Sequence, residues 1–420
     1  MVLLRTVQSL LFFLFLLDLL FLGAGVNIYG LDISSRKLLF LFFCASSLLV
    51  YFGDFTEKDM VGFSLILAGF LFILIWVILI PLISHGNLIY AVSDAMPLIA
   101  SGVFLLTTKF PIWKNLWLAA RGLMLRFLYL FTILHVILYF IFMIYPNLVT
   151  DLTEVFALIF DIGTGNDAKF VFFTSLDGDI SRIYFGSSFL LLIGFYFLLS
   201  DEGENFGRSL RSRFFFAILL VVALWATNTR SLLLGAVAMV IFFPISRWLM
   251  KRINKSWLTV FLLIILPLFL VFLLIPTVDM QLLAFVGLDR DGSDDIRSEQ
   301  LYSLLNTISE NILFGLGFGA NALIVRNEDA PYSYELSILA LFMKIGVSGV
   351  LVACGIWASI LLNLLPKEGQ EFEKKFTALY ALYISFVISC FYNPYIFGFF
   401  GTFFLLFILY EFAFVARGEK

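Results

Sequence analysis

Two arginines and one glutamate have the side chains and the setting for chemistry on an anion. Arg230 ends a polar break, TNTR, between two apolar runs, and Arg297 lies in residues 278–333, the longest polar stretch of the chain. Glu335 stands where the next apolar run begins. A guanidinium donates two parallel hydrogen bonds to a phosphate and keeps its charge, and a carboxylate beside it could accept a proton from an attacking hydroxyl. These residues suggest group transfer from a lipid diphosphate, with the arginines stabilising the departing diphosphate.

Further ionisable residues interrupt the apolar runs: Asp18, Asp94, His135 and Lys344. A charge inside a bilayer is costly unless it is paired or hydrated, so such residues tend to mark a site or a pathway. Together they indicate a polar cavity open to the outer side, in which Asp94 or His135 is an alternative base to Glu335. As a structural alternative, Asp18 or Asp94 would pair with Lys344. His135 would then be a hydrogen-bonded core residue, and Glu335 would pair with Lys344 or Arg326.

Metal, nucleotide and disulfide chemistry are not indicated. The chain has 2 His, and its 3 Cys lack CxxC spacing. DRDGSDD, residues 289–295, has its glycine at the fourth position rather than the sixth, so it does not match a calcium loop. GLGFG, residues 315–319, follows a helical pattern rather than a strand, which favours a tight turn over a dinucleotide fingerprint. We therefore expect no metal and no cofactor.

The composition places the chain in a membrane. It is 62% hydrophobic and 14% charged, with a mean hydropathy of +1.03, whereas soluble domains are about 25% charged. The formal net charge is -3, and the 27 Lys and Arg residues are scattered rather than gathered in a basic stripe. The lipid bilayer is therefore an expected partner, and nucleic acid is not.

The apolar runs predict an all-α polytopic membrane protein with about 12 crossings, in a single integral-membrane domain over residues 1–420. Lys and Arg are more numerous in the connections on one side, which places both termini in the cytoplasm by the positive-inside rule. The predicted spans are about 7–23, 38–53, 61–83, 88–108, 117–144, 183–200, 214–226, 231–249, 257–277, 334–364, 377–392 and 395–415.

Two long connections lie on the outer side in this topology, residues 145–182 and 278–333. Loops of this length are usually functional or disordered. Within the second, SDD at 293–295 offers an N-cap, so we expect an amphipathic helix over about 294–313. Its apolar face would hold Leu301, Leu304, Leu305, Ile308 and Ile312, and its other face Ser303, Asn306, Thr307 and Glu310.

The seventh predicted span, residues 214–226, is short for a crossing, since it would rise only about 20 Å. The TNTR break would then lie below the outer surface, where irregular backbone survives only if it is buried in protein or lines a wet cavity. Arg230 would be a cation held in that cavity. The alternative is one long helix kinked near Asn228, with Arg230 extending toward the interface.

Three segments resemble the bacterial O-antigen polymerases and ligases, which are integral-membrane glycosyltransferases. TNTRSLLLGAVAMVIFF (227–243) resembles the family's polar break with an arginine, and RSEQLYSLLNTISENILFGLGFGAN (297–321) its outer-loop arginine, amphipathic helix and glycine turn. YELSILALFMKIGVSGVL (334–351) is similar to the segment in which ligases usually carry His-Asn before an apolar helix with Gly-x-x-Gly. Glu335 and Leu336 stand at the His-Asn positions, which is a departure from the ligase pattern.

The resemblance implies a C-type glycosyltransferase (GT-C-like) fold with a large outer loop between helices 9 and 10. It also implies a metal-independent reaction at the outer face of the bacterial cytoplasmic membrane. Donor and acceptor would be undecaprenyl-diphosphate-linked oligosaccharides, and a chain-length regulator would be a further partner. Arg230 and Arg297 would bind the donor diphosphate, and Glu335 would be the general base. The supporting residues would be Asn228, Arg290, Arg326, Tyr334 and Lys344.

Two other functions fit the same pattern. A ligase would transfer finished glycan to lipid A core, although the absent His-Asn pair counts against it. A flippase or transporter would need access from both faces and often has an internal repeat, which we do not find in the sequence. The sequence does not specify the sugars, the linkage or the class of surface glycan, whether O-antigen, capsule or exopolysaccharide.

Overall fold

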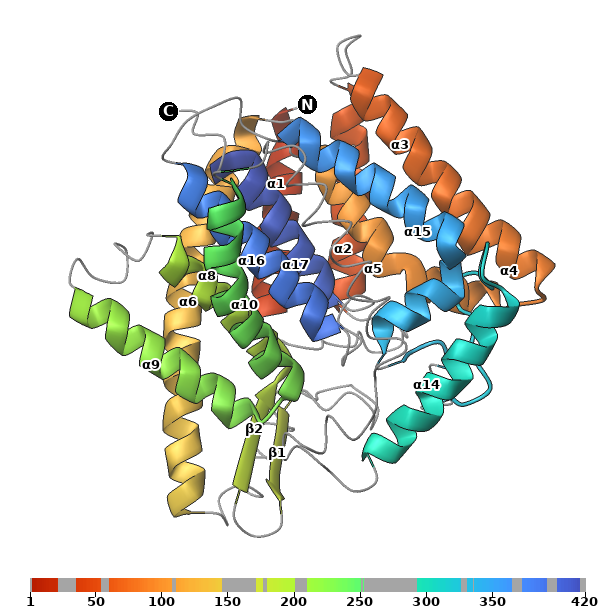
Figure 1. Cartoon of the computed structure of the whole chain (residues 1–420). Coiled ribbons are helices and arrows are strands. Elements are labelled where there is room, and N and C mark those ends of the chain that lie inside the picture. The colour runs from red at the N-terminus through yellow and green to blue at the C-terminus, as the bar shows by residue number, and fades with distance from the viewer. Residues whose placement is uncertain are drawn as a thin grey trace. The chain divides into compact units, whose positions relative to one another are not determined.

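The computed structural model describes most of the chain as two compact units, and Figure 1 shows its elements. One unit comprises Met1–Phe55 and Val103–Ala236, and the other comprises Thr56–Gly102 and Val237–Lys420. The described residues are 2–21, 35–53, 60–107, 111–145, 171–176, 180–200, 210–250, 252, 293–325, 331–334, 336–364, 372–390 and 399–415.

Helices occupy the positions of the predicted spans, except that span 257–277 lies outside the described residues. The helices are α1 (Val2–Phe21), α2 (Ser35–Gly53), α3 (Met60–Ile73), α4 (Ile80–Ile83), α5 (Leu88–Thr107), α6 (Pro111–Ile144), α8 (Leu191–Leu199), α9 (Leu210–Thr227), α10 (Arg230–Met250), α14 (Ser293–Glu310), α15 (Ser337–Leu364), α16 (Phe372–Cys390) and α17 (Phe399–Tyr410). Short segments of other helical type are η2 (Leu74–Leu79), η3 (Gly186–Leu190) and η7 (Glu411–Val415).

The apolar helices are those of a polytopic membrane protein. Among the described residues, three helical stretches are long and apolar enough to cross a bilayer: Lys114–Ile144, Arg230–Met250 and Ser337–Ile356. Shorter apolar helices accompany them, among them Leu67–Ile83, Leu88–Ile99 and Gly401–Ala413. The total of about 12 crossings and the GT-C-like arrangement stay predictions.

A β-hairpin in the first unit corrects the all-α expectation. Strand β1 (Val171–Leu176) pairs antiparallel with β2 (Ile180–Phe185), with Val171 opposite Phe185 and Leu176 opposite Ile180. Both strands are rich in aromatic and β-branched residues, and the sequence between them is DGD, which is typical of hairpin loops. The predicted span 183–200 therefore begins as strand and 3-10 helix, and α8 starts only at Leu191.

The remaining elements of the first unit pack as helix pairs. Helices α1 and α2 lie together, and the Gln8 side-chain amide donates a buried hydrogen bond of 2.8 Å to Ser47 Oγ between them. Helices α6, α8 and α9 also pack against one another. Gly194 allows the close approach of α8 to α9, since a Cβ at this position would lie 2.8 Å from Leu220 Cδ2.

The second unit contains a bent helix that positions the site described below. Residues 60–83 run as one rod of α3, η2 and α4, and α15 packs against its α3 and η2 parts. Helix α15 is kinked at Gly346, and Figure 1 shows that its ribbon changes direction along its length. Its first residue, Ser337, donates from Oγ to the carbonyl of Cys390 over 2.6 Å, which ties the start of α15 to the end of α16.

Candidate functional site

Helix α15 is broken in the middle of its apolar length. Gly346 has φ 61° and ψ -175°, which is outside helical geometry. The amides of Val347 and Ser348 therefore do not bond to the helical carbonyls four residues earlier. They donate instead to the carbonyls of Ile312 (2.9 Å) and Leu313 (3.0 Å), which come from the segment that follows α14.

The same segment also satisfies the carbonyls that the break leaves open. The carbonyls of Met343 and Lys344 accept from the amides of Leu316 (3.0 Å) and Gly317 (2.8 Å). Residues 312–317 thus replace the two missing helical hydrogen bonds with four bonds of their own. Irregular backbone is tolerated at membrane depth only where its polar groups are satisfied inside the protein or face a wet cavity. The break in α15 is therefore stabilised by specific hydrogen bonds to residues 312–317 and is not a simple kink.

The glycines of GLGFG make this insertion possible. Gly315, Gly317 and Gly319 have φ of 70°, 87° and 76°. A Cβ at Gly315 would lie 2.5 Å from the carbonyl carbon of Lys344, so the two backbones meet where only glycine fits. The sequence motif was interpreted as a tight turn, and the structure shows that it is the segment docked in the break of α15.

The rod of α3, η2 and α4 supplies one more acceptor to this segment. In the π-helical part η2, the amide of Ile80 bonds to the carbonyl of Ile75 rather than to that of Trp76. The π-type partner of Trp76 would be the amide of the fifth residue on, Pro81, which has no N–H. The Trp76 carbonyl accepts from the amide of Phe318 over 2.9 Å instead. Helix widening and a proline thus leave a docking point for the glycine segment.

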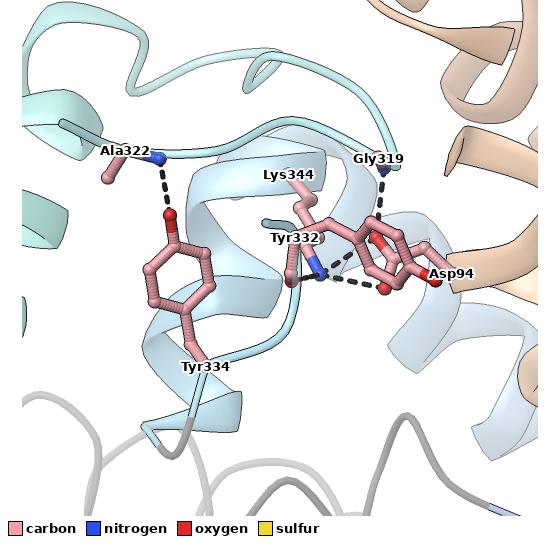
Figure 2. Close-up of polar contacts among 6 residues, drawn as sticks. All are labelled: Asp94, Gly319, Ala322, Tyr332, Tyr334 and Lys344. Atoms are coloured by element: carbon pink, nitrogen blue, oxygen red, sulfur yellow. Dashed lines mark hydrogen bonds and ion pairs between the residues drawn. The ribbon is translucent and has the colours of Figure 1, made fainter. Parts of the chain in front are cut away.

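A buried ion pair lies where these elements meet (Figure 2). Lys344 Nζ lies 2.8 Å from both carboxylate oxygens of Asp94, and it donates to the carbonyl of Tyr332 over 2.8 Å. Asp94 Oδ2 also accepts from the amide of Gly319 over 2.9 Å. The side chains of Lys344 and Asp94 are 0% and 1% exposed. The pair therefore joins α5, α15 and both loop segments, and it realises the structural alternative for these two residues.

Two tyrosines flank the pair just before α15. The Tyr334 hydroxyl accepts from the amide of Ala322 over 2.6 Å, as Figure 2 shows. The ring of Tyr332 packs at a tilt against that of Tyr90, with centroids 5.5 Å apart. Burial raises the pKa of Tyr332, and the nearby Asp94 carboxylate raises it further, so its phenol stays neutral at ordinary pH.

Helix α14 packs on α15 and carries the predicted diphosphate arginine. Leu301 and Leu304 of α14 form a buried cluster whose other members include Tyr334 and Leu339. The buried face differs from the predicted one: Ser303, expected on the solvent face, is 8% exposed, and its Oγ accepts from the amide of Ile324 over 3.1 Å. Ile312, expected on the apolar face, lies beyond the helix end and is 54% exposed.

The structure describes the position of Arg297 on α14 but not its side chain. It precedes Gln300 by three residues and Leu304 by seven, so the three positions share one face of the helix. Glu335, Arg290 and Arg326 also lie outside the described residues, as does the side chain of Asp18. Their assigned roles stay predictions.

The TNTR break separates two helices, as the first interpretation required. Thr227 ends α9, Asn228 has φ 44°, and Arg230 is the first residue of α10. The Thr227 and Thr229 hydroxyls donate to carbonyls of Leu224 (2.7 Å) and Thr227 (3.0 Å), which satisfies part of the irregular backbone. Arg230 thus adds its charge to the positive end of a helix dipole, a setting that suits an anion.

The predicted length of the helix before the TNTR break, residues 214–226, is wrong. Helix α9 begins at Leu210 and has 18 residues, because Arg211 and Arg213 continue the helix below the apolar run. At about 1.5 Å per residue it rises about 27 Å. The depth of Arg230 in the membrane therefore no longer follows from helix length.

His135 lies in the first unit, whereas Asp94 and Lys344 belong to the second. It is fully buried, with Nδ1 3.1 Å from the carbonyl of Phe131 and Nε2 2.9 Å from Ser188 Oγ. Because a carbonyl only accepts, Nδ1 carries the proton and Nε2 accepts from Ser188. Ser188 Oγ in turn accepts from the amide of Phe185 over 2.9 Å. This network ties α6 to the end of the hairpin, as expected of a core histidine.

Sequence reasoning missed several residues of the site: Trp76, Pro81, Gln300, Tyr332 and the non-helical Gly346. Gln300 has a usable signal, since it stands one helical turn after Arg297. Gly346 belongs to the Gly-x-x-Gly pattern, which served only to align this segment with the ligases and did not indicate a broken helix. Among the described residues, no group of three or more His, Cys, Asp or Glu side chains is placed to hold a metal ion.

The second unit is thus a membrane domain with a discontinuous apolar helix, whose break is filled by a segment from the adjoining polar loop. Discontinuous helices in membrane proteins commonly form binding sites. Residues 215–362 match the family model described as O-antigen ligase, which supports the resemblance of this chain to the O-antigen polymerases and ligases. The matched region includes Arg230, Arg297 and Lys344. No curated protein and no solved structure matches the chain.

Proposed function

We propose that this protein polymerises lipid-linked oligosaccharide repeat units into a surface polysaccharide. One structural observation carries the proposal: the helix with Arg297 and the segment that leads to Glu335 are held together within one unit. Leu301 and Leu304 of α14 share a buried cluster with Tyr334, whose hydroxyl binds the amide of Ala322. The helix that carries Arg297 is thereby held against Tyr334, the residue that precedes Glu335 in the sequence.

The reaction joins a growing glycan to a single repeat unit. A sugar hydroxyl of the acceptor attacks the anomeric carbon of the donor glycan, and the bond between that carbon and undecaprenyl diphosphate breaks. Glu335 accepts the proton of the attacking hydroxyl, and undecaprenyl diphosphate leaves with the bonding electron pair. Arg297 stabilises the negative charge that develops on the diphosphate. Arg230, which belongs to the first unit, is the second diphosphate-binding arginine that the family resemblance implies.

The Asp94–Lys344 pair has a positioning role in this scheme. Both oxygens of the carboxylate are engaged by Lys344, and one also binds the amide of Gly319. Both oxygens of this carboxylate are thus occupied by donors from the protein. The pair therefore fixes the loop segments on either side of the site, and Glu335 remains the base of the proposal.

Guanidinium groups take the place that a divalent cation holds in many diphosphate-dependent enzymes, so we propose a metal-independent reaction with no cofactor. The acceptor and donor are both undecaprenyl-diphosphate-linked oligosaccharides at the outer face of the bacterial cytoplasmic membrane. A chain-length regulator is a further proposed partner.

A ligase is the second candidate, favoured by the description of the matching family model. Its reaction needs the same leaving group but a different acceptor, lipid A core. The presence of Glu335 and Leu336 at the positions where ligases usually carry His-Asn favours polymerisation.

A deletion strain tests the proposed function through its surface glycans. Loss of a polymerase leaves core with a single repeat unit and causes lipid-linked single repeats to accumulate. Loss of a ligase leaves bare core, and loss of a flippase traps the lipid-linked unit in the cytoplasm. Electrophoresis of extracted glycans, with the gene restored on a plasmid as the control, distinguishes the three. Bare core in the deletion strain would contradict the polymerase assignment.

A further inference from the structure

Gln300 is buried in α14 with no hydrogen-bond partner in the part of the chain that the structure describes. Its side chain is 0% exposed, and both Nε2 and Oε1 are buried without a partner. Folded proteins satisfy nearly all buried polar groups, because an unpaired amide loses its bonds to water and gains nothing in return. An unpaired buried amide with two polar atoms therefore calls for an explanation.

The neighbouring polar residues on the same helix face do not share this condition. Ser303 Oγ accepts from the amide of Ile324 over 3.1 Å, and the Thr307 hydroxyl donates to the carbonyl of Ser303 over 2.8 Å. Both hydroxyls are thus satisfied within the protein. Gln300 lies one turn before Ser303 in this row and one turn after Arg297.

The position of Gln300 connects it to the proposed site. Arg297, Gln300 and Leu304 are spaced i, i+3 and i+7, so they lie along one face of α14. Leu304 belongs to the cluster that contains Tyr334, next to Glu335 in the chain. Gln300 therefore lies between the proposed diphosphate-binding arginine and the contact that fixes the segment of the proposed base.

The chemistry of an amide indicates which part of the substrate it would bind. A diphosphate only accepts hydrogen bonds, so it would pair Nε2 and leave Oε1 unsatisfied. A sugar hydroxyl or acetamido group both donates and accepts, and it can satisfy both atoms of the glutamine. A sugar is thus a better match than the phosphate.

We propose that Gln300 is a substrate-binding residue that holds the donor sugar next to the diphosphate, donating from Nε2 and accepting at Oε1. This inference rests on the proposed function, since it takes the diphosphate at Arg297 as its reference point. It assigns sugar recognition to a helix that would otherwise serve only to carry the arginine.

The test uses the purified full chain and two ligands. One is the lipid-linked single repeat unit extracted from the deletion strain, and the other is undecaprenyl diphosphate, which has no sugar. Gln300→Met keeps the side-chain volume and removes both polar atoms. We expect its affinity for the lipid-linked repeat to fall roughly ten- to a hundredfold, about tenfold for each hydrogen bond lost. Affinity for undecaprenyl diphosphate should not change.

Stability provides the second readout. Because Gln300 bonds to nothing in the described protein, the ligand-free Gln300→Met variant should unfold at the same temperature as the natural protein or at a higher one. Gln8 is the matched control, since it is a buried glutamine whose amide does bond to Ser47 Oγ. Gln8→Met should lower the unfolding temperature and leave binding of both ligands unchanged.

Gln300→Glu provides a second variant that keeps the acceptor oxygen and loses the donor. We expect weaker binding of the lipid-linked repeat here too. Unchanged binding of the repeat by Gln300→Met, or a lowered unfolding temperature of that ligand-free variant, would overturn the inference about Gln300. If the deletion strain accumulates no lipid-linked repeat, the proposed function itself fails, which is a separate result.

Discussion

Lys344→Met should remove a large part of the free energy of unfolding of the second unit. The substitution keeps an apolar side chain of similar length but removes the ammonium that lies 2.8 Å from both oxygens of Asp94. Among the described contacts, the carboxylate then keeps the amide of Gly319 as its donor. The carbonyl of Tyr332 also loses its hydrogen bond from Nζ.

The expected magnitude follows from these losses. Removing one partner of a buried ion pair costs about 3–5 kcal/mol, and an orphaned buried acceptor costs about 1–3 kcal/mol. Allowing for their overlap, we expect Lys344→Met to lower the free energy of unfolding by about 4–6 kcal/mol. Since whole proteins are stable by about 5–15 kcal/mol, this loss should reduce the amount of folded protein in membranes.

A double variant separates the ion pair from general damage. Asp94→Leu combined with Lys344→Met leaves no unpaired charge, so its cost should come from the amide of Gly319 and the carbonyl of Tyr332. At about 1–3 kcal/mol for each group, the double variant should cost about 2–6 kcal/mol, which is less than the sum of the two single variants. Glu299→Gln, which removes an exposed charge from α14, should change stability by less than about 0.5 kcal/mol.

The assay is equilibrium unfolding of the purified protein in mixed micelles with increasing amounts of a denaturing detergent, followed by tryptophan fluorescence. The reasoning would be refuted if each single variant lowered the free energy of unfolding by less than about 1 kcal/mol, because an unpaired buried charge destabilises a protein by more than that. Strict additivity of the two single substitutions in the double variant would refute it as well.

Three further predictions test the broken helix and the reaction. Gly315→Ala should weaken folding and activity, because Gly315 has φ 70° and the new Cβ would lie 2.5 Å from the Lys344 carbonyl carbon. Gly355→Ala is the control: its Cβ would enter open space, so in the same unfolding assay it should stabilise α15 by about 0.5–1 kcal/mol. Tyr334→Phe removes the acceptor for the amide of Ala322 and should cost about 1–3 kcal/mol; a variant as stable as the natural protein would show that this bond contributes nothing. Chain growth by purified membranes should continue in excess EDTA, and its complete loss, restored by added magnesium, would contradict metal independence.

Hydropathy predicted the helices well because an apolar run in lipid must pair its own backbone N–H and C=O groups, and a helix does this within the segment. The same reasoning failed where polar residues continue a helix or aromatic residues form a strand. Arg211 and Arg213 extend α9 beyond its apolar run, which made the helix look shorter than it is. The hairpin of β1 and β2 was assigned to a loop and to the start of a helix, since its aromatic residues suit either a strand or a buried helix.

The charged pair was among the alternatives that the sequence offered, but its partners were not predictable. Asp94 and Lys344 are far apart in the sequence, and their common contact with the glycine segment depends on the break at Gly346. That break is stable only because distant amides and carbonyls, such as those of Phe318 and Trp76, complete each other's hydrogen bonds. Local pattern cannot reveal such non-local pairing.

The buried face of α14 illustrates a further limit. Counting apolar residues placed Ser303 toward solvent, but the helix turns so that Ser303 and Gln300 are buried. A polar residue can be buried when a loop amide satisfies it, as Ile324 does for Ser303. Arg230, Arg297 and Glu335 could be selected from their residue types and their setting in the sequence, and the match over residues 215–362 supports the family resemblance but not their individual roles.

The most direct test of the proposed polymerase is the surface glycan of an Arg297→Ala strain. We expect core carrying a single repeat unit, accumulation of lipid-linked single repeats, and a normal amount of the variant protein in the membrane. Glu335→Gln should give the same pattern. Arg252→Ala, which removes an exposed positive charge stacked on Trp248, serves as the control and should make long polymer. Polymer of normal length from the Arg297→Ala strain would contradict the account.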